Sequence, residues 1–235
     1  MEQLWNEIEI IEQAGFPLGT DAVLLAQFAQ LPKMARVADL GSSWGTLGLM
    51  LCAKDAHCCV TGIERNENAH TAALSNISHN RLEGRLSSLL GDVREISTLL
   101  PAGSFDCVIS NPPYFPVGSG KLSLKNAEAR SEEFLDLPQL CAAAAWLLPS
   151  GGRFFMVHRP ERLCDIFCAL REVSIEPKRL QFVRHKEGAL PCLVLIEGRR
   201  GGKSGLSFEP DFIEFTESGE ETAQYRAAYH RGEQL

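Results

Sequence analysis

Short apolar runs alternate with longer helix-like segments along most of this 235-residue chain, and this alternation constrains the fold more than any other feature. The apolar runs are typical of buried strands, whereas residues 46–54 and 66–80 have the length and spacing of helices. Strands separated by helices pair in parallel, which predicts a sheet with helices on both faces. The last two apolar runs, residues 178–185 and 190–198, are joined by a short turn and are therefore expected to form an antiparallel hairpin.

Polar residues or a glycine turn follow the first four apolar runs, in chain order. They are Asp39 with Gly41, Glu64, Asp92 and Asn111. In parallel sheets, ligands bind at the carboxyl ends of the strands, close to the point where the strand order reverses. The sequence therefore predicts one ligand site formed by these strand ends.

The stretch "DLGSSWGTLGL" predicts a tight glycine turn between the first strand and a helix. Gly41 lets the backbone approach a ligand, and Gly45 opens the helix. Glu64 can accept hydrogen bonds from a ribose diol, and Asp92 can accept one from an adenine amine. Either acid could instead cap a helix, and the dinucleotide pattern G-x-G-x-x-G is absent. Two acids at successive strand ends, after a glycine turn, favour an adenosine ligand.

This loop resembles the D-x-G-x-G-x-G loop of class I S-adenosylmethionine-dependent methyltransferases. The upstream "GFPLGTDAVLLAQF" resembles the F-x-x-G-T-D-A-x-L-L segment of their amino-methyltransferase branch. The resemblance implies a Rossmann-like α/β fold, with a seven-stranded, mostly parallel sheet and an antiparallel terminal hairpin. It also implies S-adenosylmethionine as the cofactor. The cofactor-binding residues that it implies are Thr20, Asp21, Asp39, Gly41, Gly45, Glu64, Asp92 and Asn111.

One position of the loop departs from the family pattern. Ser43 replaces the middle glycine, and Trp44 follows it. A serine held at positive φ costs about 1–2 kcal/mol, so we expect strain here if the loop keeps the family's shape. Trp44 either crowds the cofactor or packs beside it.

The segment "NPPYF", Asn111 to Phe115, follows the fourth apolar run and resembles the N-P-P-Y/F motif of methyltransferases that modify planar nitrogens. We expect the Asn111 side chain and the Pro112 carbonyl to accept hydrogen bonds from the target amine. Pro113 completes the motif, and Tyr114 would stack on the flat substrate. The motif alone allows adenine N6, cytosine N4, guanine N2 or a glutamine amide.

Over most of its length the chain resembles the bacterial tRNA(Val) adenine-37 N6-methyltransferase family. The matches are "AEARSEE", the "GGRFFMVHRPERLCDIF" run and the basic "EGRRGGKSG" segment. The resemblance implies a tRNA partner. The substrate-binding residues that we expect are Tyr114, Phe115, Arg130, Arg159, Arg199, Arg200 and Lys203. Arg159 and Arg162 could equally form a salt-bridge network at the start of their helix, with Glu161 and Asp165.

Charge is unevenly distributed in this chain, whose net charge is −7. Residues 178–203 hold seven Lys or Arg and two Glu, whereas residues 209–235 hold seven acids and two Arg. We expect three parts: an N-terminal segment that packs on the cofactor site (1–32), a methyltransferase core (33–200) and a C-terminal extension (201–235).

Eight scattered cysteines, without zinc-like spacing, predict buried reduced thiols and no metal site. The absence of a signal peptide or a long apolar span predicts a cytoplasmic protein that does not enter membranes. Two alternatives to the tRNA enzyme remain. One is a glutamine methyltransferase of release factors, which shares N-P-P-Y, and the other is a non-catalytic module that binds cofactor or RNA. The oligomeric state is not indicated by the sequence.

Overall fold

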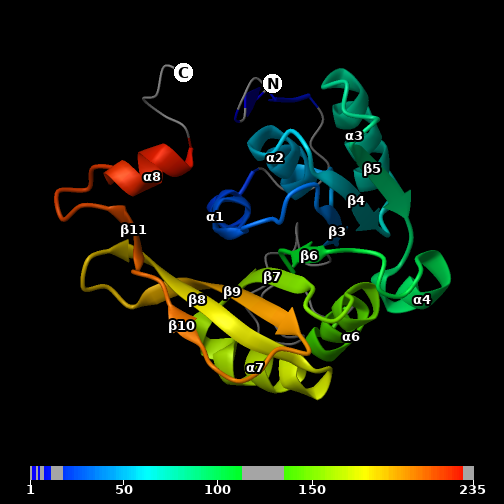
Figure 1. The fold of residues 1–235 in the computed structure, drawn as a ribbon. Coiled ribbons are helices and arrows are strands. Elements are labelled where there is room, and N and C mark those ends of the chain that lie inside the picture. Colours follow the sequence, from blue (N-terminus) through cyan, green and yellow to red (C-terminus); the bar gives the residue numbers. More distant parts are fainter. Residues whose placement is uncertain (1, 4, 6–7, 12–17, 113–134, 230–235) are drawn as a thin grey trace.

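The computed structural model describes residues 2–3, 5, 8–11, 18–112 and 135–229 (Figure 1). Their main feature is a nine-stranded sheet with strand order β10-β8-β9-β7-β6-β3-β4-β5, and β11 also pairs with β8. Its strands are β3 (Arg36–Leu40), β4 (Cys59–Glu64), β5 (Leu86–Leu90), β6 (Cys107–Ser110), β7 (Arg153–His158), β8 (Ile175–Lys186), β9 (Pro191–Arg200), β10 (Ser207–Phe208) and β11 (Phe212–Phe215). A separate two-stranded sheet joins β1 (Glu2–Gln3) and β2 (Glu9–Ile10).

Helices cover both faces of the sheet and divide the apolar side chains into two cores (Figure 1). The helices are α1 (Thr20–Phe28), α2 (Thr46–Lys54), α3 (Glu67–His79), α4 (Ile96–Leu99), α6 (Leu137–Leu147), α7 (Leu163–Glu172) and α8 (Ala223–Ala228), with 3-10 turns η2 (Val93–Glu95) and η3 (Pro160–Arg162). Residues of α1 and α2 belong to one core, together with Trp5 and Tyr225. Residues of α6 and α7 belong to the other core.

The predicted fold class is confirmed, and all seven expected strands are present as β3 to β9. Strand β9 runs antiparallel to both β7 and β8, as expected for the terminal hairpin. The structure adds β10 and β11, which pair in parallel with β8. Part of the expected C-terminal extension therefore continues the main sheet. The expected three-part division of the chain stays a prediction.

The strand order reverses next to β3, which pairs with β4 on one side and with β6 on the other. The chain first builds outward through β4 and β5 and then crosses back to β6. Such a switch point leaves the carboxyl ends of two neighbouring strands facing helices on opposite sides of the sheet, which opens a crevice there. The predicted ligand residues follow these same strands.

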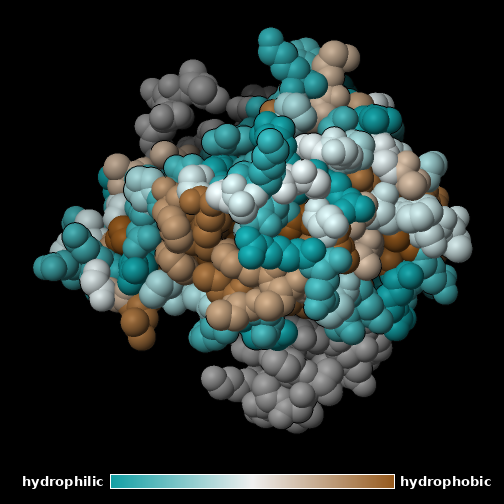
Figure 2. Space-filling view, turned by 60° about the horizontal axis from the view of Figure 1, so that its bottom comes forward, coloured by the Kyte–Doolittle hydropathy of each residue, from teal (hydrophilic) through white to brown (hydrophobic). Residues whose placement is uncertain are grey.

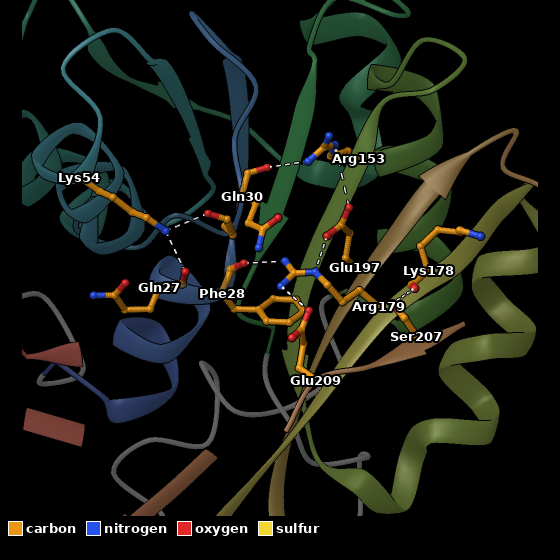
Figure 3. A network of polar contacts seen from close by, with 11 residues as sticks. Gln27, Phe28, Gln30, Lys54, Arg153, Lys178, Arg179, Glu197, Ser207 and Glu209 are labelled. Carbon is orange, nitrogen blue, oxygen red and sulfur yellow. Dashed lines mark hydrogen bonds and ion pairs between the residues drawn. The ribbon is translucent and has the colours of Figure 1, made fainter. Parts of the chain in front are cut away.

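Three cations donate to carbonyl groups of residues 26–30, at and just after the C-terminal end of helix α1 (Figure 3). The Lys54 Nζ atom donates to the carbonyls of residues 26, 27 and 29 at 2.8–2.9 Å. Arg179 donates to Phe28 O at 2.7 Å, and Arg153 donates to Gln30 O at 2.9 Å. The last carbonyls of a helix have no partners within the helix, and cations there also favour the helix dipole. This network fixes α1 against the start of β7 and the middle of β8.

Glu197 of β9 connects two of these cations. Its carboxylate accepts from Arg179 Nε at 2.8 Å and lies 3.9 Å from Arg153 Nε (Figure 3). Arg179 also stacks over the Phe28 ring, 3.9 Å from its centroid. Burial lowers the pKa of Lys54 to about 8, and Arg179 adds to this effect.

The cysteines are only partly as expected. All eight are free, and four are buried. Three are exposed, namely Cys59, Cys164 and Cys168. The expectation of buried thiols is wrong for these three: Cys59 is the first residue of β4, and Cys164 and Cys168 lie one turn apart on α7.

The face shown in Figure 2 is a mixture of hydrophilic residues and a smaller hydrophobic area, in which brown residues gather. Large apolar side chains with high exposure among the described residues include Met34, Leu190 and Phe208.

Within the part of the chain that the structure describes, no helix is long and apolar enough to span a bilayer.

Replacing Lys54 by Met keeps most of the side-chain volume and removes all three bonds to the end of α1. We expect the free energy of unfolding to fall by about 2–3 kcal/mol, because partly buried carbonyls lose a charged donor. Urea denaturation measures this. Lys33→Met, at an exposed position just after α1, is the control and should change stability by less than about 0.5 kcal/mol. Equal stability of the two variants would contradict the anchoring role.

Candidate functional site

The predicted ligand residues of three strands lie side by side at one edge of the sheet. Asp39 pairs in register with Gly62 of β4 and with Ile109 of β6. Continuing that register places Gly41 between Glu64 and Asn111, with neighbouring strands about 4.8 Å apart. We call this end of the strands, where the C-terminal residues of β3, β4 and β6 lie, the carboxyl edge of the sheet.

The loop after β3 contains two glycines and one serine in left-handed conformations. The φ angles are 77° at Gly41, 51° at Ser43 and 89° at Gly45. A Cβ atom added to Gly41 would meet no atom within 4 Å, so the space beside its backbone is open. Ser43 has positive φ, as expected if the loop keeps the family's shape, and this conformation costs about 1–2 kcal/mol.

Glu64 holds this loop against the next strand. Its Oε2 atom accepts from the Ser43 N–H at 2.8 Å, and its Oε1 atom accepts from the Asn66 N–H at 2.7 Å. The bond to Ser43 offsets part of the strain at that residue. Each carboxylate oxygen retains a second lone pair, so Glu64 can still accept from ribose hydroxyls.

Asp39 is a buried carboxylate without a hydrogen-bond partner. It is 1% exposed, and neither of its oxygens has a partner, nor does the hydroxyl of buried Ser42. Burial raises the pKa of Asp39 to about 8, and the nearby Glu64 charge adds to this effect. Unpaired polar groups of this kind are costly unless a ligand completes them. They lie beside the open space at the Gly41 turn and fit the cationic amino-acid part of a cofactor.

Trp44 packs into the core instead of lying over the loop, since it is 1% exposed and belongs to the same apolar cluster as Trp5. Its carbonyl accepts from the side-chain amide of Asn76 at 3.1 Å. The Asn76 side-chain oxygen accepts from the Ile11 N–H at 3.0 Å. Asn76 therefore links the N-terminal segment to the cofactor loop. Sequence reasoning missed it because nothing in a helical "SNISHN" stretch distinguishes a buried asparagine from an exposed one.

Asp92 acts as a helix cap in this structure. Its carboxylate accepts from the Arg94 backbone N–H at 2.9 Å and pairs with the Arg94 guanidinium at 2.5–3.1 Å. The Arg94 contact holds the pKa of Asp92 below its usual value. The alternative of a capping acid is therefore observed. A role of Asp92 at adenine stays a prediction.

Thr20 and Asp21 form the start of α1, at its end remote from the Lys54 anchor. The chain just after the C-terminal end of α1 faces the start of β7, since Arg153 donates to Gln30 O. The Asp21 carboxylate accepts from the Ala22 N–H at 2.8 Å. A position of this pair beside Asp39 and Glu64 stays a prediction.

Asn111 and Pro112 directly follow β6 at the carboxyl edge, and both are half-buried. The preceding Ser110 hydroxyl donates to Leu40 O at 2.8 Å, which ties the end of β6 to the end of β3. Four of the expected motif and substrate residues lie outside the described residues. They are Pro113, Tyr114, Phe115 and Arg130.

Arg159 also lies at the carboxyl edge, just after β7. Its guanidinium donates to Cys192 O at 3.0 Å, and its N–H donates to the ring of His158 at 2.8 Å. Burial lowers the pKa of His158 to about 4, so the ring is neutral at pH 7. The ion pair expected at this helix start is formed by Arg162 with Asp165, at 2.7 Å.

Arg199, Arg200 and Lys203 lie at the opposite, amino edge of the sheet. Arg199 pairs in register with Arg153, the first residue of β7, whereas the carboxyl edge begins after its last residue, His158. The structure therefore does not bring these three cations together with Asn111. Any RNA contact that they make lies outside the reaction centre.

Among residues 2–3, 5, 8–11, 18–112 and 135–229, no group of three or more potential metal ligands is close enough to hold an ion. The carboxyl edge instead carries the glycine turn with Ser43 at positive φ, Glu64, which accepts a hydrogen bond from that turn, and the buried Asp39. With the strand order described above, these features define a class I S-adenosylmethionine-dependent methyltransferase.

The chain belongs to the methyltransferase small domain family, whose model matches residues 14–173. It is similar to the tRNA1(Val) (adenine(37)-N6)-methyltransferase of Shigella dysenteriae serotype 1, with 30% identity over 79% of this chain and 76% of the relative. The enzyme of the same name from Aeromonas salmonicida is 29% identical, over 81% of this chain and 79% of the relative.

Solved structures show the same fold. A protein from Agrobacterium tumefaciens, described as a predicted O-methyltransferase, superposes with a TM-score of 0.74 at 22% identity, over 90% of this chain and 96% of that one. A geranyl diphosphate methyltransferase in complex with S-adenosylmethionine gives a TM-score of 0.57 at 13% identity, over 76% of this chain and 84% of that one. The predictions of a methyltransferase and of its cofactor are confirmed, and the non-catalytic alternative is set aside.

Binding of S-adenosylmethionine at pH 7 should release close to one proton from Asp39. In the free protein this carboxyl is mostly protonated because its pKa is about 8, and the cofactor's ammonium and sulfonium charges favour the ionised form. Calorimetric titration in buffers with different ionisation enthalpies measures the release. It should disappear above about pH 9, where Asp39 is already ionised, and in Asp39→Asn at any pH.

The pH dependence of stability in the cofactor-free protein provides a second test of the pKa of Asp39. Asp39 ionises near pH 3.8 when unfolded but only near 8 when folded, so its contribution to stability is present below pH 3.8 and is lost by about pH 8. Asp39→Asn should remove this decline. Proton release that is unchanged in Asp39→Asn would show that another group titrates.

Proposed function

We propose that this enzyme transfers the methyl group of S-adenosylmethionine to N6 of adenine 37 in valine tRNA. The observation that carries the proposal is the position of Asn111 and Pro112, one strand away from the open Gly41 turn. The names of the Shigella and Aeromonas relatives support this substrate.

The cofactor supplies an electrophilic methyl group on a sulfonium. The chain's own residues then need to hold a weak nucleophile in line with it. An adenine amine has its lone pair delocalised into the ring, so an acceptor for each N–H draws the nitrogen toward tetrahedral geometry. The Asn111 side-chain oxygen and the Pro112 carbonyl are suited to these roles, and the fixed φ of proline makes its carbonyl a rigid acceptor. Positioning of this kind accounts for most of the rate, and the product amine loses its proton afterwards.

The substrate base has to leave its stack to reach Asn111. We expect Tyr114 and Phe115 to contact the flat base after it leaves the stack, and Arg130 and Arg159 to contact the RNA near the reaction centre. Arg159 is the described residue of this group, and it lies at the carboxyl edge.

The assay that tests the proposal offers labelled S-adenosylmethionine and unmodified valine tRNA to the purified enzyme. Mass spectrometry of the digested nucleosides should reveal N6-methyladenosine, at position 37 when the tRNA is cut into fragments. A release-factor protein offered in parallel covers the glutamine alternative. Methylation of that protein, with none of the tRNA, would overturn the proposal.

Asn111→Ala should reduce methyl transfer at least a hundredfold because the amine loses a positioned acceptor. The dissociation constant for S-adenosylmethionine should change less than about threefold, and calorimetry measures this in the same preparation. Asn111→Asp is the matched variant, since it keeps an acceptor oxygen while adding a charge. Activity of Asn111→Ala within tenfold of the wild type would exclude the proposed mechanism.

Combined replacement of Arg199, Arg200 and Lys203 by Gln should weaken tRNA binding about tenfold at low salt. Among the described residues, the side chains of Arg199 and Arg200 donate to the backbone carbonyls Gly151 O and Val173 O, which carry no formal charge. Removing up to three phosphate contacts should lower the slope of log affinity against log salt by about 2. Fluorescence anisotropy with labelled tRNA measures both quantities.

The matched control removes three exposed cations elsewhere, with Lys33→Gln, Arg81→Gln and Arg226→Gln. It makes the same change in net charge. If both triple variants bind tRNA equally well, the amino edge makes no specific contact with RNA.

A further inference from the structure

The C-terminal end of helix α8 packs against α1, the helix that begins with Thr20 and Asp21 (Figure 1). Near one end of α8, the Tyr229 hydroxyl donates to Thr20 Oγ1 at 2.9 Å, and the Tyr225 hydroxyl lies 3.5 Å from the same atom. Two turns further along α1, the Gln27 side chain lies 3.5 Å from Ala228 O. Contacts at both ends of α1 fix the relative position of the two helices.

Helix α8 is itself fixed to the main sheet. The Thr222 hydroxyl accepts from the Tyr225 N–H at 3.1 Å, which caps the helix, and donates to Ile213 O of β11 at 2.6 Å. The ring of Tyr225 lies 5.2 Å from that of Phe215 and 4.9 Å from that of Tyr229. Strand β11 pairs with β8, so the sheet fixes the position of α8 and of its two tyrosines.

The N-terminal segment adds a contact from a third direction. The Trp5 indole N–H donates to Ala228 O at 3.0 Å, and Trp5 is 3% exposed. Thus α8 is held by β11, by α1 and by Trp5. This arrangement leaves Tyr229 little freedom to move away from Thr20.

We propose that Tyr229 is a positioning residue of the cofactor site, through which the C-terminal extension sets the orientation of the Thr20 hydroxyl. The inference rests on the proposed role of Thr20 in cofactor binding. A hydroxyl has one proton and two lone pairs. Once Thr20 Oγ1 accepts from Tyr229, its proton points elsewhere and is available to a ligand at the N-terminal end of α1.

Tyr225 has a different role in this arrangement. Its hydroxyl lies at the outer limit of hydrogen-bond length from Thr20, and its ring is buried between Phe212, Phe215 and Tyr229. The ring supports α8, whereas the hydroxyl contributes little. The two tyrosines therefore form a matched pair for an experiment, because the same Tyr→Phe change removes a short bond in one case and a long one in the other.

The experiment is a double-mutant cycle on the full-length chain, with S-adenosylmethionine affinity as the readout. Tyr229→Phe should raise the dissociation constant about three- to tenfold, in keeping with the loss of one hydrogen bond. Thr20→Val, which keeps the shape and removes the hydroxyl, should raise it at least as much. If Tyr229 acts through Thr20, the double variant should bind no more weakly than Thr20→Val alone.

Steady-state kinetics provide a readout that a purely structural role would not change. Tyr229→Phe should raise KM for S-adenosylmethionine while kcat at saturating cofactor stays within twofold. Tyr225→Phe, the control, should change neither parameter more than twofold. Thermal melting of each variant shows whether the fold is intact, and we expect midpoints within a few degrees of the wild type.

Several results would overturn the inference. Multiplicative effects of Tyr229→Phe and Thr20→Val would mean that the two hydroxyls act independently. Equal losses in Tyr225→Phe and Tyr229→Phe would indicate general loosening of α8. An unchanged affinity in Thr20→Val would refute the role of Thr20 and the inference with it. Methylation of tRNA by the wild-type enzyme would still test the proposed function separately.

Discussion

The parallel register of β3, β4 and β6 is the constraint on which the site depends. Because these strands run in the same direction and end at the same level, residues 39, 64 and 111 come together although they are far apart in the chain. Hydrogen bonds then secure the ends of the strands. Glu64 accepts a hydrogen bond from the Ser43 N–H, and the Ser110 hydroxyl of β6 donates to Leu40 O of β3. The strained loop is stable because its neighbours hold it, which is how backbone strain persists at functional sites.

Helix α1 is held at both ends by groups from distant parts of the chain. Lys54 and Arg179 donate to carbonyls at its C-terminal end, Arg153 donates to Gln30 O just after it, and Tyr229 contacts its first residue, Thr20. Residues 207–229 of the expected C-terminal extension continue the main sheet through β10 and β11 and bring α8 against α1, where Tyr229 contacts the predicted cofactor residue Thr20. The N-terminal segment has a comparable place, because Asn76 connects it to the cofactor loop.

The basic residues that we expect to bind RNA fall into two groups, one at each end of the strands. Arg159 lies at the carboxyl edge, near Asn111, whereas Arg199 and Arg200 lie near the start of β7. In the proposed complex with tRNA, the RNA would contact both edges, and Arg159 would be the one of these residues closer to the target base. In the basic segment of residues 178–203, Arg179 and Arg184 are already paired with carboxylates. Local charge in a sequence therefore overstates the charge that is available to RNA.

The sequence by itself determined the alternation of strands and helices, the strand ends that carry polar residues and the resemblance to methyltransferases. These features depend on local periodicity and short motifs, which a single chain displays directly. Only the tertiary structure decided that Trp44 packs into the core and that Arg199 lies far from Asn111. It also decided the partners of Asn76, Lys54 and Tyr229. The physical reason is that burial and hydrogen-bond partners come from residues many positions away, so no local pattern of residue types specifies them.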